Sequence, residues 1–208
     1  MSVDAKICGI MDEAGLLAAI DGGAKYVGFV FYDKSKNVIK PEEARKLALL
    51  VPAHVTKTGL FVNAESTYVR AIAQTVPLDL LQLHGNEKPD YIAELKRKTG
   101  KPVMKALRMR EESDLAAVPA YENVADRLLF DSRIGNEPSG GPINWAMLKG
   151  RTFKKPWMLA GGLNVHNLAE AVHTSGAKAV DVSSGVEDKP GHKSPDKIRA
   201  FLAAAAKV

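Results

Sequence analysis

The sequence contains a single cysteine among 208 residues, which excludes an internal disulfide framework. It also lacks cysteines and histidines clustered at zinc-binding spacing, so we expect no metal site. No stretch of about 18 uncharged apolar residues occurs, and residues 1–6 hold no apolar export signal. Together these absences predict a cytoplasmic protein, in a reducing compartment, that does not associate with a membrane.

Charge of one sign is not concentrated anywhere along the chain. The 29 basic side chains are interspersed with 24 acidic ones, for a formal net charge of +5, and no run of like charges appears. A scattered excess of this size is typical of a solvated surface. We therefore expect no nucleic-acid binding, whereas mild attraction of an anionic metabolite fits the charge equally well.

Length and composition favour one globular domain. Apolar residues make up 46% of the chain and charged residues 25%, close to the averages for soluble domains. A chain of this length suits a closed α/β barrel as one unit. No linker or change of composition divides the chain, so we predict a single domain over residues 1–208.

Short β-rich runs alternate with longer segments of helical period, which predicts βα units and a parallel sheet. The predicted strands are residues 5–9, 26–31, 58–62, 80–84, 103–107, 128–131, 157–160 and 179–183. The predicted helices include residues 12–21, 41–50, 65–75, 88–98, 164–174 and 195–206. Eight regular units favour a closed (β/α)8 TIM barrel over an open doubly wound sheet. The irregular stretch 131–145 indicates an active-site loop.

Several predicted strands end on polar side chains, and barrel enzymes take their catalytic groups from such ends. Lys6 and Cys8 share one face of the first strand, Gln82 or His84 ends the fourth, and Asp131 ends the sixth. A nearby ammonium lowers a thiol pKa from roughly 8.5, which would make Cys8 a usable base. The alternatives are a small buried hydrophobe for Cys8 and a structural ion-pair partner for Asp131. A base and an acid from opposite sides of the barrel mouth suit proton transfer.

The exits of the last two predicted strands are rich in glycine. Gly161 and Gly162 follow the seventh strand, and Ser183, Ser184 and Gly185 end the eighth. Glycines let backbone N–H groups approach an anion closely, and a following helix adds partial positive charge. Barrels often hold a phosphate at these two loops. We therefore predict a phosphorylated small molecule as ligand, although the glycines could also serve only to make tight turns.

Six segments, in order and at barrel-strand spacing, resemble the phosphoribosylanthranilate isomerase family of tryptophan biosynthesis. They cover almost the whole chain and are residues 6–10 (KICGI), 26–32 (YVGFVFY), 59–63 (GLFVN), 81–85 (LQLHG), 159–164 (LAGGLN) and 180–187 (VDVSSGVE). One such string would be weak evidence, but six in this order are highly specific.

The resemblance implies a cofactor-independent Amadori rearrangement of N-(5-phosphoribosyl)anthranilate to 1-(o-carboxyphenylamino)-1-deoxyribulose 5-phosphate. Cys8 matches the general base that removes the proton from ribose C2. Asp131 matches the general acid that protonates the ring oxygen. The phosphate cradle matches Gly161 and Gly162 together with residues 183–185. The sequence is equally compatible with a monomer and with a homodimer.

The chain departs from the family pattern in two loops. Asn37 stands where the family has an arginine expected to hold the anthranilate carboxylate, and an amide cannot make that bidentate contact. We hypothesise that Lys36 or Arg108 partly replaces it. We expect these three residues, like Gln82 and His84, to contact the substrate.

The second departure lies in residues 137–145, where the family has a Gly-Gly pair followed by Phe-Asp-Trp; we expect a stiffer loop with altered closure.

Two other functions compete with the isomerase. One is an isomerase for a related phosphorylated aminosugar, which the missing arginine favours. The other is a non-catalytic barrel that binds a phosphorylated metabolite, which would have no need of both Cys8 and Asp131.

Overall fold

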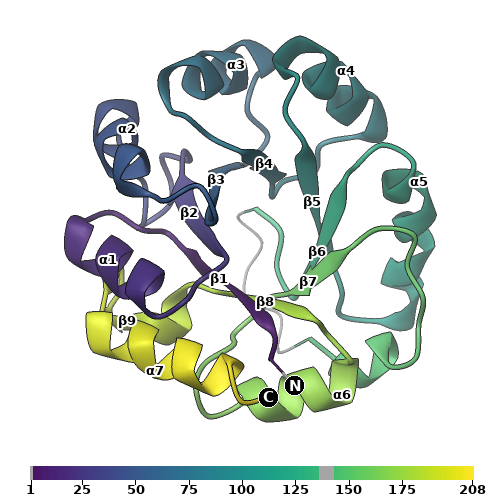
Figure 1. The fold of residues 1–208 in the computed structure, drawn as a ribbon. Helices are drawn as coiled ribbons and strands as arrows, with labels where there is room; N and C mark the ends of the chain where they lie inside the picture. The colour runs from purple at the N-terminus through teal and green to yellow at the C-terminus, as the bar shows by residue number, and fades with distance from the viewer. Residues whose placement is uncertain (1, 136–142) are drawn as a thin grey trace.

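The predicted strands form one closed parallel barrel in the computed structural model, which describes residues 2–135 and 143–208 (Figure 1). Each strand pairs with its neighbour in the sequence, and β8 pairs with β1 to close the barrel. The strands are β1 (Asp4–Cys8), β2 (Tyr26–Val30), β3 (Thr56–Phe61), β4 (Leu80–Leu83), β5 (Val103–Arg108), β6 (Arg127–Asp131), β7 (Trp157–Leu159) and β8 (Ala179–Val182). The prediction of a closed TIM barrel is confirmed.

Helices surround the barrel (Figure 1). They are α1 (Glu13–Asp21), α2 (Pro41–Leu50), α3 (Ser66–Thr75), α4 (Pro89–Thr99), α5 (Val118–Glu122), α6 (Leu168–Ser175) and α7 (Pro195–Ala205). The last helix packs along α1 and brings the two chain ends together, where the N–H of Val3 donates to the carbonyl of Ala205 at 3.1 Å. None of the helices in the described residues combines the length and apolar character needed to cross a membrane.

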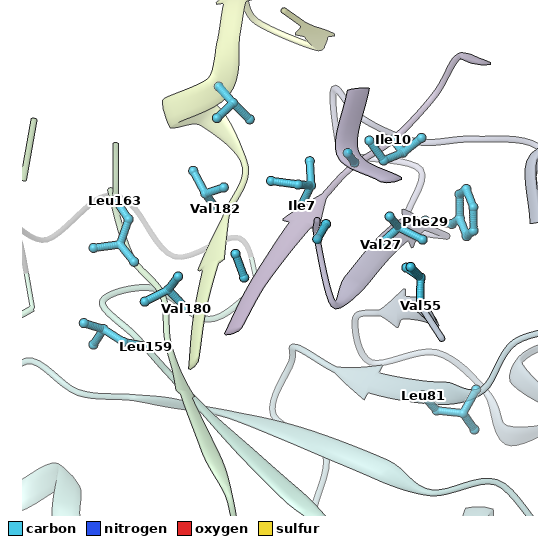
Figure 2. Packing of buried hydrophobic residues seen from close by; sticks show 14 of the residues in the cluster. Ile7, Ile10, Val27, Phe29, Val55, Leu81, Leu159, Leu163, Val180 and Val182 are labelled. Carbon is cyan, nitrogen blue, oxygen red and sulfur yellow. The ribbon is translucent and has the colours of Figure 1, made fainter. Parts of the chain in front are cut away.

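Side chains alternate between the lumen and the helix layer, as a strand period of two requires. Ile7, Val27 and Val182 project from neighbouring strands into the outer apolar layer (Figure 2). Lys6 and Cys8, on either side of Ile7, therefore face the lumen together, as predicted. The apolar part of the lumen is a separate cluster of Tyr26, Leu80, Met104, Ala106, Leu129, Ile134, Met158, Ala160 and Ala179.

The helix after β7 begins later than its sequence period indicates. Helix α6 starts at Leu168, whereas the pattern predicted a start at residue 164. Oδ1 of Asn164 accepts from the N–H of His166 at 2.9 Å, and Oδ1 of Asn167 accepts from the N–H of Asn164 at 2.8 Å. Asparagine side chains compete with the helix for backbone donors in this way. The segment after Gly162 thus stays an open loop next to the barrel mouth.

Three connections are less regular than the predicted eight βα units. The link from β5 to β6 holds the 3-10 helix η1 (Glu112–Ala117) before the short α5. The described part of the link from β6 to β7 holds η2 (Trp145–Leu148). After β8 come η3 (Ser184–Val186) and an antiparallel hairpin of β9 (Glu187–Lys189) and β10 (His192–Lys193), which the sequence pattern did not predict. Stiffening was expected for residues 137–145, of which residues 137–142 lie outside the described residues.

Candidate active site

Polar groups gather around a cavity of about 540 Å³ at the carboxyl ends of the last three strands. Asp131 at the end of β6, Gly161 and Gly162 after β7, and Ser183 and Ser184 after β8 all line it. The structure thus brings the predicted acid and the two predicted phosphate loops to one place. In the closed barrel, β7 and β8 lie between the strand of Asp131 and β1, which carries Cys8.

Cys8 is the last residue of β1 and is 4% exposed. It lies in register with Gly28 of β2, while Lys6 lies in register with Asp181 of β8. Nζ of Lys6 donates to Oδ1 of Asp181 at 3.0 Å, and both side chains are buried. Since Asp181 also lines the 540 Å³ cavity, it connects the cavity wall to the lysine and the thiol below.

Gly28 leaves the space that this arrangement needs. A Cβ at position 28 would lie 3.0 Å from Sγ of Cys8 and 3.2 Å from Nζ of Lys6. Both atoms therefore converge on the same point above the glycine. A larger residue at position 28 would push the thiol and the ammonium apart.

Burial raises the pKa of the Cys8 thiol above its ordinary value. The Lys6 ammonium lowers the pKa of Cys8, and the Asp181 carboxylate raises it further, but burial decides the net direction. The sequence-based expectation of a lowered thiol pKa is therefore wrong for the net effect. It took account of the neighbouring ammonium and not of the cost of placing a thiolate in a dry lumen.

Burial alone would lower the pKa of Lys6, yet Asp181 and Cys8 reverse that effect and leave the pKa of Lys6 raised. Lys6 is consequently an ammonium at neutral pH, while Cys8 is predominantly a protonated thiol in the unliganded protein.

Asp131 is held in a defined orientation at the cavity edge. Its Oδ1 accepts from the N–H of Arg133 at 3.0 Å, and its Oδ2 lies 3.4 Å from Nε2 of His84. The Asp131 side chain is 17% exposed, so the cavity gives access to it. Asp131 shares its face of β6 with Leu129, which belongs to the lumen cluster, as the alternation predicted.

Gln82 and His84, predicted to contact substrate, form a chain that leads to the acid. Nε2 of Gln82 lies 3.0 Å from Nδ1 of His84, and Nε2 of His84 lies 3.2 Å from the carbonyl of Arg133. An amide N–H donated to Nδ1 leaves the proton of a neutral imidazole on Nε2, facing the carboxylate. His84 thus belongs to the surroundings of Asp131, and Gln82 is fully buried behind it.

The two glycine-rich loops touch each other. Gly161 and Gly162 have φ values of +90° and +72°, which side chains rarely adopt. A Cβ at Gly185 would overlap the carbonyl oxygen of Leu163. The segments 161–163 and 183–185, called the phosphate loops below, therefore pack without space for any side chain between them.

Lys193 of β10 secures the second phosphate loop. Its Nζ donates to the carbonyl and the hydroxyl of Ser183, at 3.1 Å each, and to Oε1 of Glu187 at 2.6 Å. Hydrogen bonds from Lys193 and Asn37 help keep the pKa of Glu187 below its ordinary value, although burial acts in the opposite direction. No periodic pattern in the sequence points to Lys193, because its contacts depend on the β9–β10 hairpin that follows β8.

Asn37 lies beside the carboxyl end of β1, but its side-chain amide is hydrogen-bonded to a residue of β9. Its Nδ2 donates to Oε1 of Glu187 at 3.0 Å, and its side chain packs against Gly9, the residue after Cys8. Within residues 2–135 and 143–208, Oδ1 of Asn37 is buried without a hydrogen-bond partner. The neighbouring Lys36 is exposed.

Arg108 lies apart from this group. It ends β5, pairs with Asp114 at 2.9 Å, and lines a second cavity of about 640 Å³ together with Tyr121 and Lys105. The described residues that line the 540 Å³ cavity do not include Arg108. The structure therefore separates the two proposed substitutes for the family arginine, and of the two only Lys36 adjoins position 37. Among the described residues, no three His, Cys, Asp or Glu side chains form a group that could hold a metal ion.

Comparison with known proteins agrees with this geometry. The model of the family described as N-(5'phosphoribosyl)anthranilate (PRA) isomerase matches residues 5–204. The N-(5'-phosphoribosyl)anthranilate isomerase of Rhodospirillum centenum is 49% identical, and the alignment covers 99% of each chain.

Solved structures give the same result. The phosphoribosyl anthranilate isomerase of Thermotoga maritima has 37% identity and a TM-score of 0.88, covering 99% of this chain and 100% of its own. Another phosphoribosyl anthranilate isomerase was solved in complex with reduced 1-(o-carboxyphenylamino)-1-deoxyribulose 5-phosphate; it has 36% identity and a TM-score of 0.85, covering 99% and 100%. The chain belongs to the N-(5'-phosphoribosyl)anthranilate isomerase family.

Proposed function

We propose that this protein is a phosphoribosylanthranilate isomerase of tryptophan biosynthesis, an aldose-ketose isomerase that converts N-(5-phosphoribosyl)anthranilate to 1-(o-carboxyphenylamino)-1-deoxyribulose 5-phosphate. The observation that carries the proposal is the meeting of Asp131 and both phosphate loops around one cavity, whose wall also includes the Asp181 that binds Lys6 beside Cys8. The family match over residues 5–204 supports the same substrate. We expect the enzyme to act in the cytoplasm, as a monomer or a homodimer, through one catalytic domain.

The reaction begins with opening of the sugar ring. Asp131, as general acid, gives a proton to the ring oxygen, and the C1–oxygen bond breaks to leave an iminium between C1 and the anthranilate nitrogen. The access from the cavity to the Asp131 carboxyl supports this role. The contacts of its Oδ2 with His84 and of its Oδ1 with the N–H of Arg133 hold the carboxyl group in one orientation.

Proton removal completes the rearrangement. The thiolate of Cys8, as general base, takes the proton from C2, and the electrons of that C–H bond form a C1–C2 double bond while the iminium is neutralised. The resulting enolamine takes up a proton at C1 while its C2 hydroxyl releases one, which gives the ketone, so the reaction adds and removes no atoms overall. The iminium is a cation, so its presence favours the charged thiolate despite burial.

The phosphate loops would hold the far end of the substrate. Backbone N–H groups of glycine-rich turns bind phosphate closely, and the Lys193 contact to Ser183 keeps the second loop in place. Binding a remote phosphate supplies energy that orients the reacting carbons. This supports an arrangement in which few side chains are needed for the chemistry itself.

The proposal is tested by adding purified protein to freshly made phosphoribosylanthranilate and following the loss of anthranilate fluorescence. We expect cofactor-independent turnover, with 1-(o-carboxyphenylamino)-1-deoxyribulose 5-phosphate as product by mass spectrometry and chromatography. Saturable, phosphate-dependent binding without turnover would contradict the enzyme assignment and favour the non-catalytic binder.

One observation favours a second enzyme function. Asn37 replaces the family arginine and is bonded to Glu187, so the usual partner of the anthranilate carboxylate is missing. An isomerase for a related phosphorylated aminosugar with a different acceptor would not need that arginine. Slow turnover of phosphoribosylanthranilate, with faster turnover of another aminosugar phosphate, would select this alternative.

If anthranilate is the acceptor, we expect Lys36 to supply part of the missing charge. Lys36→Ala should then raise KM about tenfold, because a charge-assisted hydrogen bond is worth about 1.5–3 kcal/mol. Arg108→Ala tests the other candidate, and Lys34→Ala is the matched control because Lys34 is an exposed lysine of the same loop. Steady-state kinetics decide the matter. If KM is unchanged in both Lys36→Ala and Arg108→Ala, the compensation hypothesis is wrong.

A further inference from the structure

The lumen of the barrel contains a fully buried lysine next to the only cysteine. Lys6 is 0% exposed, and its Nζ lies 3.0 Å from Oδ1 of Asp181, itself 8% exposed. Removing an ammonium and a carboxylate from water costs several kcal/mol per ion, and well-packed apolar residues are often as stable in such places. Stability therefore does not account for an ion pair at this position.

Lys105, a second buried lysine of the barrel, makes the contacts expected of a residue with a structural role. Lys105, 1% exposed, lies on the outer face of β5, where its Nζ contacts Oε2 of Glu87 at 2.8 Å and the carbonyls of Gly85 and Leu83 at 2.6 and 3.4 Å. Three oxygen acceptors match the three N–H donors of an ammonium. This lysine fastens the loop after β4.

The Lys6 ammonium has fewer oxygen acceptors than the Lys105 ammonium. Among the described residues, Asp181 is the one oxygen acceptor recorded for its Nζ, which leaves N–H donors for another group. That group is the sulfur of Cys8, because Nζ and Sγ both converge on the space above Gly28, and each side chain acts electrostatically on the pKa of the other.

We propose that Lys6 is a positioning residue for the general base: held by Asp181, its ammonium donates to the sulfur and stabilises the thiolate of Cys8 while the thiolate removes the substrate proton. The inference rests on the proposed function, in which Cys8 is that base. The thiol proton leaves to solvent before the reaction, Cys8 then carries the proton from C2, and Lys6 keeps its three protons throughout. Gly28 is the residue that lets the two side chains meet.

In the part of the chain that the structure describes, the charged groups that act on Cys8 come from three elements. Lys6 of β1 and Lys193 of β10 favour the thiolate, and Asp181 of β8 opposes it. Lys193 is neutralised by Glu187 and Asp181 by Lys6 itself. Of the two cations, Lys6 has the larger effect on the pKa of the Cys8 thiol, and its Nζ and the Cys8 sulfur converge on the space above Gly28. Removing Lys6 should therefore shift the thiol equilibrium more than any change in the hairpin.

The single cysteine allows a direct test, because any thiolate signal in the full-length protein comes from Cys8. The ultraviolet absorbance of the thiolate is titrated against pH, with Cys8→Ser as the blank that removes the five tyrosines from the difference. We expect Lys6→Met to raise the measured pKa of Cys8 by about one unit or more. The rise in kcat/KM with pH should move to higher pH by the same amount.

Two further variants keep the test independent of folding and of turnover. Lys105→Met removes an equally buried, ion-paired lysine away from the thiol and should leave the pKa of Cys8 unchanged. Lys6→Met/Asp181→Asn removes both charges, avoids an unpaired carboxylate, and should still raise the pKa of Cys8. An unchanged pKa in both Lys6 variants, or an equal shift in Lys105→Met, overturns the proposal. The titration needs no substrate. A protein without isomerase activity would therefore contradict the proposed function, while the effect of Lys6 on the pKa of Cys8 could still be measured.

Discussion

Cys8→Ser is expected to lower kcat/KM for phosphoribosylanthranilate about 10³-fold, the scale of general base catalysis. Serine fills the same space at the end of β1, but a hydroxyl is far less acidic than a thiol and does not form the anion that takes the proton from C2. The Lys6 ammonium would remain in place beside it. Steady-state kinetics by anthranilate fluorescence, at several pH values, measure the loss.

Asp131→Asn is the companion variant, because an amide cannot protonate the ring oxygen and its loss should be of the same order. The control is binding of reduced 1-(o-carboxyphenylamino)-1-deoxyribulose 5-phosphate, the compound bound to a solved relative. Its Kd should change little in Cys8→Ser, since the phosphate loops are untouched. Retained turnover in either variant, with the ligand still bound, would remove that residue from its proposed role.

The second large effect is expected at the contact between the phosphate loops. Gly185→Ala should raise KM for the phosphorylated substrate about 100-fold, because the new Cβ would overlap the carbonyl oxygen of Leu163 and separate the loops. Displacements of about 1 Å at a substrate-positioning site cost on the order of 10² in rate. The Kd of the same reduced product analogue, by calorimetry, gives the binding part of the effect.

Gly176→Ala is the matched control for that variant. Gly176 ends α6 with φ +77°, and a Cβ there would meet no atom of the described residues within 4 Å. The substitution should therefore lower the free energy of unfolding by about 1 kcal/mol through backbone strain and leave KM unchanged. If Gly176→Ala weakens the ligand as much as Gly185→Ala does, general loss of stability explains both results and the loop contact does not.

Much of the architecture could be predicted from local pattern. The strands were expected within two residues of their observed ends, because short apolar runs bounded by glycine and helix caps are local signals. The same alternation predicted that Lys6 shares a face with Cys8 and Asp131 with Leu129, and the structure turns both faces toward the lumen. Helix α6 was predicted four residues too early because side-chain bonds of Asn164 and Asn167 replace a helical turn.

Site residues could be predicted where their position along a strand determines their location. They could be predicted less well where contacts between distant segments determine it. Asp131 and the glycine-rich exits follow from strand ends. The contact of His84 with Asp131 and the clamp of Lys193 on Ser183 depend on how neighbouring strands and the β9–β10 hairpin pack. Arg108, proposed from its strand end to compensate for Asn37, lies in a different cavity with Asp114.

The sequence by itself determined the barrel, the residues that share a face of β1 and of β6, and the family to which the chain is similar, since all three follow from the order and spacing of residues. Only the tertiary structure decided the protonation of Cys8, the pairing of Lys6 with Asp181, and the partner of Asn37. These depend on burial and on charges brought together from distant parts of the chain. A thiol beside a lysine has a lowered pKa in water and a raised one in this lumen, because desolvation outweighs the neighbouring charge.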